Sequence, residues 1–222
     1  MAARRVADTY GGYRARLVEV LREQGIEDLA VLRAFGETPR HLFVPEALRR
    51  QAYEDTSLPI GFGQTISQPS TQAAYLHALE LRGVEKVLEV GTGSGYQTAL
   101  LATLAARVVS VERIPELAAS ARTALAAAGV SNATVLVGDG TLGWRPFAPY
   151  DAILVTAASP RVPGPLVEQL ADGGRLLIPV ERDGRQVLLR MVRGGEALEE
   201  TVLGPAQFVP LIGRHGYAPP EA

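Results

Sequence analysis

Short apolar runs alternate with longer amphipathic stretches along most of the chain, and this pattern predicts a sheet layered with helices. Short β-branched runs are typical of buried strands, whereas apolar residues three or four positions apart are typical of helices. The pattern predicts strands at 87–90, 108–111, 134–137, 150–155 and 174–180. It predicts helices between them at 96–105, 116–128 and 166–170. Strands that alternate with helices favour an α/β fold with a parallel, doubly wound sheet.

The two ends of the chain depart from this alternation. Near the start, helical spacing predicts helices at 13–24 and 28–35, and a further helical stretch at 46–52. Near the end, 186–192 and 199–208 predict antiparallel strands that close one edge of the sheet. We therefore expect an N-terminal helical cap and functional loop at 1–82, packed on a core at 83–213, and a flexible tail at 214–222.

Residues 58–72 form a polar stretch within this N-terminal region, with the sequence LPIGFGQTISQPSTQ. Its two glycines and two prolines forbid a regular helix. Hydrogen-bonding side chains crowd into a few positions, namely Gln64, Thr65, Ser67 and Gln68. Long polar loops tend to carry function, although a solvated connector is the alternative. Ser70 or Thr71 is expected to cap a helix that follows.

The strand at 87–90 runs directly into a glycine series, in the sequence VLEVGTGSGYQTALL at 87–101. Gly91, Gly93 and Gly95 leave the main chain open at the start of a helix, where backbone N–H groups can bind a ligand. The dinucleotide fingerprint G-x-G-x-x-G needs a glycine where this chain has Tyr96. With Glu89 before it, the pattern resembles the first motif of S-adenosylmethionine-dependent methyltransferases. A glycine turn without a ligand is the alternative.

Two acidic residues fall at the ends of the next predicted strands. Ligands of doubly wound sheets bind at the carboxyl ends of the strands. Glu112 ends the second strand and can accept hydrogen bonds from two ribose hydroxyls. Asp139, beside Gly140, ends the third and can accept from an adenine amino group. A solvated acid and a simple Asp-Gly turn are the respective alternatives.

Composition excludes several classes of partner and site. The 22 basic and 24 acidic residues leave a net charge of −2, which argues against a nucleic-acid partner. There is no cysteine, so disulfides and thiolate chemistry are excluded, and the three scattered histidines predict no metal site. No apolar run approaches the roughly 20 residues of a membrane span, and the first residues are polar. We expect a cytoplasmic protein with no membrane partner.

Six motifs together resemble the protein L-isoaspartyl (D-aspartyl) O-methyltransferases. They are GFGQTISQP at 61–69, VLEVGTGSGYQTA at 87–99, VERI at 111–114, GDG at 138–140, PYDAI at 149–153 and FVPL at 208–211. The likeness covers roughly residues 15–213, and TISQP discriminates best because the glycine motif is shared by many methyltransferases. It implies a class I, Rossmann-like methyltransferase fold whose last strands are reordered.

The resemblance also implies a reaction. A methyl group passes from S-adenosyl-L-methionine, which leaves S-adenosyl-L-homocysteine, to the free carboxylate of L-isoaspartyl or D-aspartyl residues in damaged proteins. The ester then initiates repair through a succinimide. The implied partners are isoaspartyl peptides and unfolded or flexible protein segments, bound by a monomer, with the cap helices and Phe208 as candidate peptide contacts.

Matched onto this chain, the motifs imply that Ser67 and Thr65 hold the acceptor carboxylate. An α-carboxyl group is already an anion at neutral pH, so alignment suffices and no general base is required. Ser67 is then a hydrogen-bond donor and not a nucleophile. The implied cofactor contacts are Gln64, Ile66, Gln72, Glu89, Gly91, Thr92, Gly93, Ser94, Gly95, Glu112, Arg113, Asp139 and Gly140.

Three other functions stay open at the level of sequence. The first is a methyltransferase that acts on a small molecule or on nucleic acid, although TAASP at 156–160 replaces the Asp/Asn-Pro-Pro-Tyr signature of amino-methylating nucleic-acid enzymes. The second is an NAD-dependent oxidoreductase. The third is a catalytically silent module that binds the cofactor.

Overall fold

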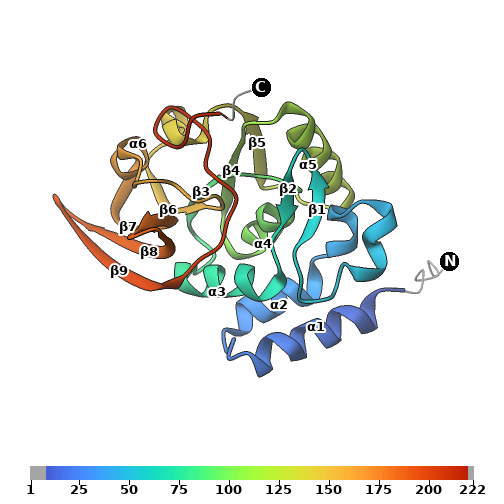
Figure 1. Ribbon diagram of the computed structural model, residues 1–222. Helices are drawn as coiled ribbons and strands as arrows, with labels where there is room; N and C mark the ends of the chain where they lie inside the picture. The colour runs from blue at the N-terminus through green and yellow to red at the C-terminus, as the bar shows by residue number, and fades with distance from the viewer. Residues whose placement is uncertain (1–8, 220–222) are drawn as a thin grey trace.

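A computed structural model describes residues 9–219, and its centre is a seven-stranded sheet with helices on both faces (Figure 1). The strands lie in the order β5-β4-β3-β6-β7-β8-β9. The parallel part comprises β3 (Lys86–Val90), β4 (Arg107–Glu112), β5 (Ala133–Val137), β6 (Tyr150–Val155) and β7 (Leu170–Arg182). The predicted α/β class and doubly wound parallel sheet are confirmed.

The strand order reverses at β3, the first strand of the seven-stranded sheet along the chain. From β3 the chain builds outward through β4 to β5, then returns to place β6 on the other side of β3. In this register Val90 lies beside both Val111 and Val155. The residues that follow these strands therefore meet at one edge, at the switch point where doubly wound sheets bind ligands.

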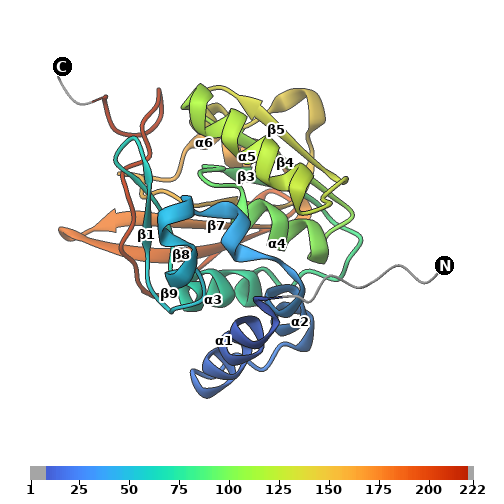
Figure 2. The ribbon, with the colours of Figure 1, turned by 90° about the vertical axis from the view of Figure 1, so that its right-hand side faces the viewer.

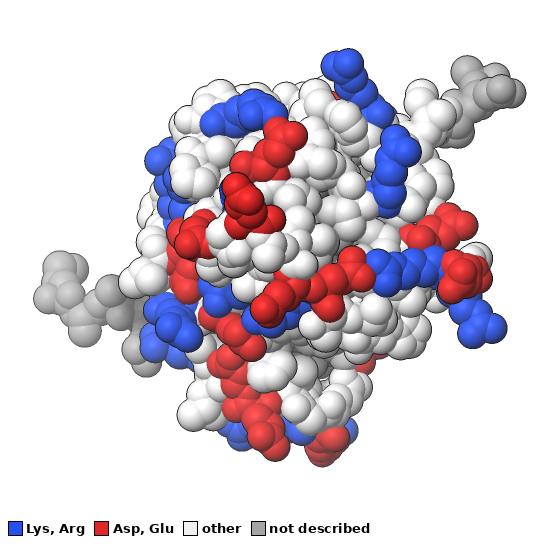
Figure 3. Space-filling model, turned by 90° about the vertical axis from the view of Figure 1, so that its left-hand side faces the viewer, with Lys and Arg blue, Asp and Glu red and all other residues white. Residues whose placement is uncertain are grey.

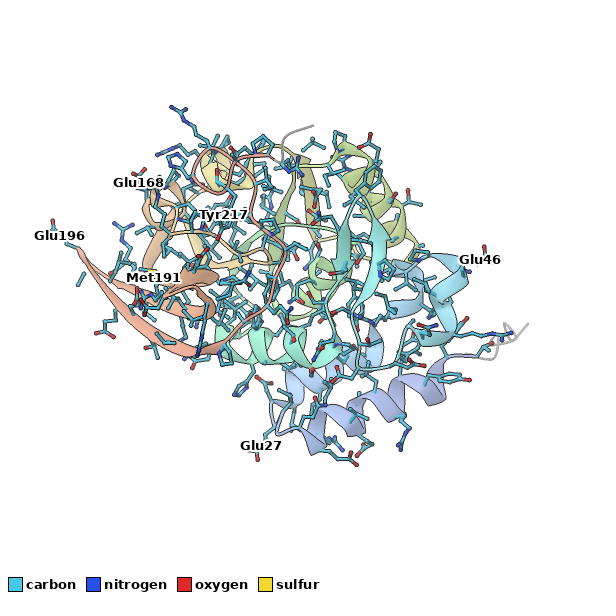
Figure 4. All side chains as sticks on the ribbon, in the orientation of Figure 1. Glu27, Glu46, Glu168, Met191, Glu196 and Tyr217 are labelled. Carbon is cyan, nitrogen blue, oxygen red and sulfur yellow. The ribbon has the colours of Figure 1, made fainter. Side chains whose placement is uncertain are left out.

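Three antiparallel strands close one side of the sheet. β8 (Arg185–Gly194) pairs with β7 and with β9 (Ala197–Pro205), so the predicted antiparallel edge is confirmed, although β9 ends before residue 208. This hairpin extends away from the body, and Glu196 lies at its tip (Figures 1 and 4). From this side of the molecule, acidic and basic side chains are interspersed (Figure 3).

The N-terminal region packs beneath the sheet helices. α1 (Gly11–Glu23) and α2 (Leu29–Glu37) contact each other, and α2 also contacts α4 (Tyr96–Leu104) (Figure 2). Asp28 begins α2 because its carboxylate accepts from the backbone N–H groups of Ala30 and Val31. The stretch predicted as helical at 46–52 is a 3-10 helix, η2 (Glu46–Gln51), which follows η1 (Arg40–Phe43).

The polar stretch at 58–72 is more regular than its sequence suggests. It forms an antiparallel hairpin of β1 (Leu58–Gly61) and β2 (Gln64–Ile66), followed by α3 (Pro69–Leu79). The predicted cap at Ser70 or Thr71 is wrong, since the helix begins at Pro69 with Gln68 in the cap position. Proline suits the first helical position because the missing N–H would have no partner there.

Two apolar cores fill the spaces on the two sides of the sheet. The larger one joins the cap to the sheet, as the burial of Leu21, Phe35, Leu79 and Leu100 together shows. The smaller one lies under α6 (Gly164–Glu168) on the opposite side, around Ile153. α5 (Pro115–Ala127) packs with α4 against β4 and β5. The described part of the cap thus packs on the core through apolar contacts.

The C-terminal segment differs from the predicted flexible tail at 214–222. The Arg214 backbone N–H donates to Asp139, and the Tyr217 hydroxyl donates to Glu181 at 2.5 Å. Tyr217 lies over the body of the molecule (Figure 4). Residues 214–217 are therefore held against the sheet, whereas 220–222 lie outside the described residues. Within residues 9–219, no helix is both long and apolar enough to cross a bilayer.

Candidate active site

The glycine turn between β3 and α4 shapes the centre of the site. Gly91, Gly93 and Gly95 have φ values of +96°, +54° and +88°, which side chains rarely adopt. A Cβ atom on Gly91 would lie 2.4 Å from the Thr156 hydroxyl oxygen. That hydroxyl donates to the Gly91 carbonyl at 2.7 Å. The turn is therefore fixed from β6, and its main chain is open to a ligand.

Glu112 faces this turn from the end of β4. One carboxylate oxygen accepts from the Gly93 N–H at 2.8 Å, and the other accepts from the Ile114 N–H at 2.9 Å. A carboxylate has about four acceptor positions, so both oxygens keep capacity for a further hydrogen bond. Glu112 is thus held in place by backbone groups and can still accept from a pair of ligand hydroxyls.

Three adjoining cavities, which share lining residues, surround the turn. A wide one of about 930 Å³ lies between the β2–α3 loop and residues 203–209. A second of about 50 Å³ lies against Gly91, Thr92, Gly93 and Ser94, and a third of about 90 Å³ reaches Glu112 and Gly140. Thr65 and Thr156 line all three, so they mark the junction.

Ser67 lies at the entrance from the wide cavity into the second one, and it lines both. The loop that carries it is tied to the cap at neighbouring positions, because the Gln68 N–H donates to Ser57 Oγ at 3.2 Å and the Ser70 N–H donates to Asp55 at 2.8 Å. Neither cavity is lined by a histidine or an acid among the described residues. The surroundings of Ser67 therefore suit a hydrogen-bond donor and lack the base that a serine nucleophile needs.

Most of the residues predicted to bind the cofactor or acceptor line these cavities. They are Gln64, Thr65, Ile66, Ser67, Gln72, Gly91, Thr92, Gly93, Ser94, Glu112, Arg113 and Gly140. The structure thus gathers three strand ends and the polar loop around one groove. Direct contact of each residue with a ligand stays a prediction.

Glu89 lies beneath the glycine turn and lines none of the three cavities. Its side chain is fully buried, and one oxygen accepts from Thr98 at 2.5 Å and from Ser110 at 2.6 Å. Ser110 in turn shares a hydrogen bond with the Thr92 hydroxyl. Burial raises the pKa of Glu89 to about 7, against the lowering effect of these hydroxyls. Glu89 therefore supports the turn from below through Ser110 and Thr92.

Gly95 and Asp139 also lie outside the cavity walls. A Cβ atom on Gly95 would meet Ala121 at 3.1 Å, so this glycine lets α4 approach α5. Asp139 accepts from the Thr141 N–H and hydroxyl and from the Arg214 N–H. Despite partial burial, these hydrogen bonds lower the pKa of Asp139. The predicted adenine acceptor is thus already engaged by the C-terminal segment.

Several cavity residues were missed by the sequence analysis. Thr156 directly follows β6, so the rule that ligands bind at strand ends could have identified it. Gln97, in the first turn of α4, lines the second cavity, and its buried amide nitrogen has no hydrogen-bond partner among residues 9–219. Tyr75 stacks on Phe208 with ring centroids 5.3 Å apart, and both line the wide cavity. Only Phe208 had been noted as a candidate, because no local pattern joins two residues so far apart in sequence.

Comparison with known proteins identifies relatives along almost the whole chain. Residues 13–216 match the family model described as protein-L-isoaspartate(D-aspartate) O-methyltransferase, slightly beyond the predicted 15–213. A protein from Methanoculleus marisnigri named protein-L-isoaspartate O-methyltransferase is 55% identical to this chain, over 95% of this chain and 96% of its own length. A protein of the same name from Dictyoglomus thermophilum is 50% identical, over 94% of each chain.

Two solved structures with similar folds carry this name in their titles. One protein-L-isoaspartate O-methyltransferase superposes with a TM-score of 0.82 at 29% identity, over 91% of this chain and 67% of its own. A putative protein-L-isoaspartate O-methyltransferase from Plasmodium falciparum, in complex with S-adenosyl-L-homocysteine, superposes with a TM-score of 0.79 at 26% identity. The match covers 90% of this chain and 98% of the other. These likenesses extend over the cap as well as the sheet.

Proposed function

The chain belongs to the protein-L-isoaspartate(D-aspartate) O-methyltransferase family, and from this premise we propose that it methylates damaged proteins. It transfers a methyl group from S-adenosyl-L-methionine to the free carboxylate of L-isoaspartyl and D-aspartyl residues. The ester initiates repair through a succinimide. The observation that carries this proposal is the meeting of three cavities at Thr65 and Thr156, because it joins a donor pocket to an acceptor pocket.

The two inner cavities fit S-adenosyl-L-methionine by their chemistry. The third one offers Glu112 for the ribose hydroxyls and the main chain of Gly140 for a flat ring. The second offers the open backbone of the glycine turn and the side chain of Gln97 to the polar end of the ligand. When bound, this cofactor supplies the electrophilic methyl group.

The acceptor is held by the polar loop. Ser67 and Thr65 donate hydrogen bonds to the isoaspartyl carboxylate, and the wide cavity accommodates the polypeptide on either side of it. The carboxylate is ionised at neutral pH, so the residues have only to hold it in line and exclude alternative geometries. Tyr75 and Phe208 form an apolar wall of this cavity beside the loop.

The wide cavity supports a polypeptide acceptor, because it has room for residues on either side of the carboxylate. We propose that this acceptor is an unfolded or flexible protein segment, since a carboxylate buried in a fold could not enter. The monomeric state, the cytoplasmic location and the lack of a nucleic-acid partner stay predictions from the sequence.

The proposal is tested by measuring whether formation of S-adenosyl-L-homocysteine depends on the acceptor that is added. Incubation of the chain with S-adenosyl-L-methionine should release S-adenosyl-L-homocysteine only when an isoaspartyl peptide is present, and added NAD should have no effect. Release without any peptide, or release driven by a nucleic acid, would contradict the acceptor class. Tight cofactor binding with no release under any condition would identify a silent binding module instead.

A further inference from the structure

Arg40, in η1 of the cap, is a buried arginine with an unusual environment. Its side chain is 0% exposed and is among the largest fully buried side chains of the described residues. Among residues 9–219 no carboxylate forms an ion pair with its guanidinium, and Asp55 acts on it only through a longer-range charge interaction. Burial lowers its pKa, but an arginine stays protonated in proteins. A buried charge of this kind is costly unless hydrogen bonds compensate it.

The hydrogen bonds of Arg40 go to the predicted site residues. Nη1 donates to Gln72 Oε1 at 2.7 Å, and Nη2 donates to the Ser67 carbonyl at 2.8 Å. The guanidinium carbon lies 4.7 Å from the ring centroid of Tyr96, which is the first residue of α4. One side chain thus joins the acceptor loop, the first turns of α3 and the helix that follows the glycine turn.

Arg40 lies behind the wall of the second cavity and does not line it. Ser67 and Gln72 line that cavity on one side, and the glycine turn lines it on the other. The planar guanidinium presents its donors in a fixed fork, so it sets the distance and angle between the groups it joins. The other ties from the cap hold Gln68 and Ser70, whereas Arg40 holds the backbone at Ser67 itself.

We propose that Arg40 is a positioning residue for methyl transfer, which fixes Ser67 and Gln72 relative to the glycine turn. This inference rests on the proposed function and deepens it, because it assigns to the cap the alignment of acceptor with donor. Arg40 touches neither substrate, so it acts through Ser67. Loss of the fork lets the acceptor loop and the Gln72 side chain shift, whereas the glycine turn and Glu112 keep their own hydrogen bonds and still hold the cofactor.

The test is a double-mutant cycle with Arg40→Lys and Ser67→Ala. Lysine keeps the charge but is one atom shorter and lacks the fork. Arg40→Lys should lower kcat for an isoaspartyl peptide by about tenfold to a hundredfold, the scale of a misaligned acceptor. It should change the Kd of S-adenosyl-L-homocysteine by less than about threefold, while Arg33→Lys, on an exposed arginine of the same cap, should leave both constants unchanged.

The cycle separates positioning from a merely structural role. If Arg40 acts through Ser67, the loss caused by Arg40→Lys should largely disappear in the Ser67→Ala background, because coupled residues are not additive. Equal losses in both backgrounds, an unaffected kcat, or a fall in cofactor affinity as large as that in kcat would overturn the inference.

An Arg40→Lys chain that fails to fold would also overturn it. Hydrogen exchange provides a second measurement, and the amides of 66–68 and of Ser70 should exchange faster in Arg40→Lys while those of 93–98 stay protected. A wild-type chain with no activity on the isoaspartyl peptide would instead refute the proposed function. Unchanged exchange around Ser67 in the Arg40→Lys variant, compared with the wild type, would refute the positioning role separately.

Discussion

The surroundings of Ser67 suit a hydrogen-bond donor and not a nucleophile. The two roles predict losses of activity of different size when the hydroxyl is removed. Ser67 lines both the wide cavity and the second one, and within residues 9–219 neither wall carries a histidine or an acid. Ser67→Ala should therefore lower kcat/KM for an isoaspartyl peptide by about a hundredfold and leave cofactor affinity intact. Ser131→Ala, at an exposed position, is the control. Single-turnover activity that falls to background, as for a lost nucleophile, would contradict the orienting role, and so would no loss at all.

Glu112 is expected to contribute to the binding of the cofactor and not to the binding of the acceptor. Its two oxygens are set by the N–H groups of Gly93 and Ile114 and keep free acceptor capacity toward the third cavity. Glu112→Ala should weaken binding of S-adenosyl-L-homocysteine by roughly 1 to 3 kcal/mol, as for lost hydrogen bonds to a charged group. Calorimetry measures this effect, with exposed Glu116→Ala as the control. An unchanged Kd would show that the ribose does not lie at β4.

Glu89 should make stability depend on pH. Burial raises its native pKa to about 7, whereas an unfolded glutamate titrates near about 4.3. Between these values the native carboxyl binds more protons than the unfolded one, so the free energy of unfolding falls as pH rises from about 4.3 to 7 and then levels off. Glu89→Gln should flatten that fall. Equal slopes for both proteins in denaturant titrations across this window would contradict the buried, protonated state.

At the scale of the element, α2 is fixed by its N-cap. Asp28 accepts from the N–H groups of Ala30 and Val31, and the helix then buries Val31, Leu32 and Phe35 against the core. Asp28→Ala should lower the free energy of unfolding by about 1 kcal/mol without affecting methyl transfer. Denaturant unfolding measures the loss, and exposed Glu27→Ala, labelled in Figure 4, is the control. Equal stability of the two variants would show that the cap does not stabilise the helix.

The elements with strong local patterns could be predicted from sequence. The strand predicted at 150–155 has the same bounds as β6, and α5 differs from its prediction by one residue at each end. The β1–β2 hairpin could not be predicted, since its strands are too short to show an alternating pattern around Gly61 and Gly63. The start of α3 was misplaced because two hydroxyl residues suitable as caps follow Pro69.

Beyond the polar loop and the glycine turn, which carry motifs of their own, the site could be predicted only where the strand-end rule applies. That rule located Glu112 and Gly140 on the third cavity. It does not reveal that the Asp139 carboxylate is taken by Arg214, a contact between residues 75 positions apart. Nor does it reveal that Glu89 faces Ser110 beneath the turn, because burial depends on how neighbouring strands pack. Contacts of this kind arise from tertiary structure, and no short window of sequence contains them.

At the scale of the whole molecule, the sheet and the cap each form a different part of the site. The strand ends and glycine turn form the inner cavities, whereas the cap supplies the β2–α3 loop and the ties that hold it. The last strands and residues 203–209 form the opposite wall of the wide cavity. Because the larger apolar core joins cap and sheet, the two halves of the site are held together by packing.

The central claim is that the protein methylates the carboxylate of an isoaspartyl residue and does not methylate a normal aspartyl residue. The most direct measurement is tandem mass spectrometry of an isoaspartyl peptide and its normal aspartyl twin after incubation with the chain and S-adenosyl-L-methionine. One added methyl group should be found on the isoaspartyl residue, with the aspartyl peptide unmodified. Equal methylation of both peptides, or a methyl group on any other residue, would contradict the account.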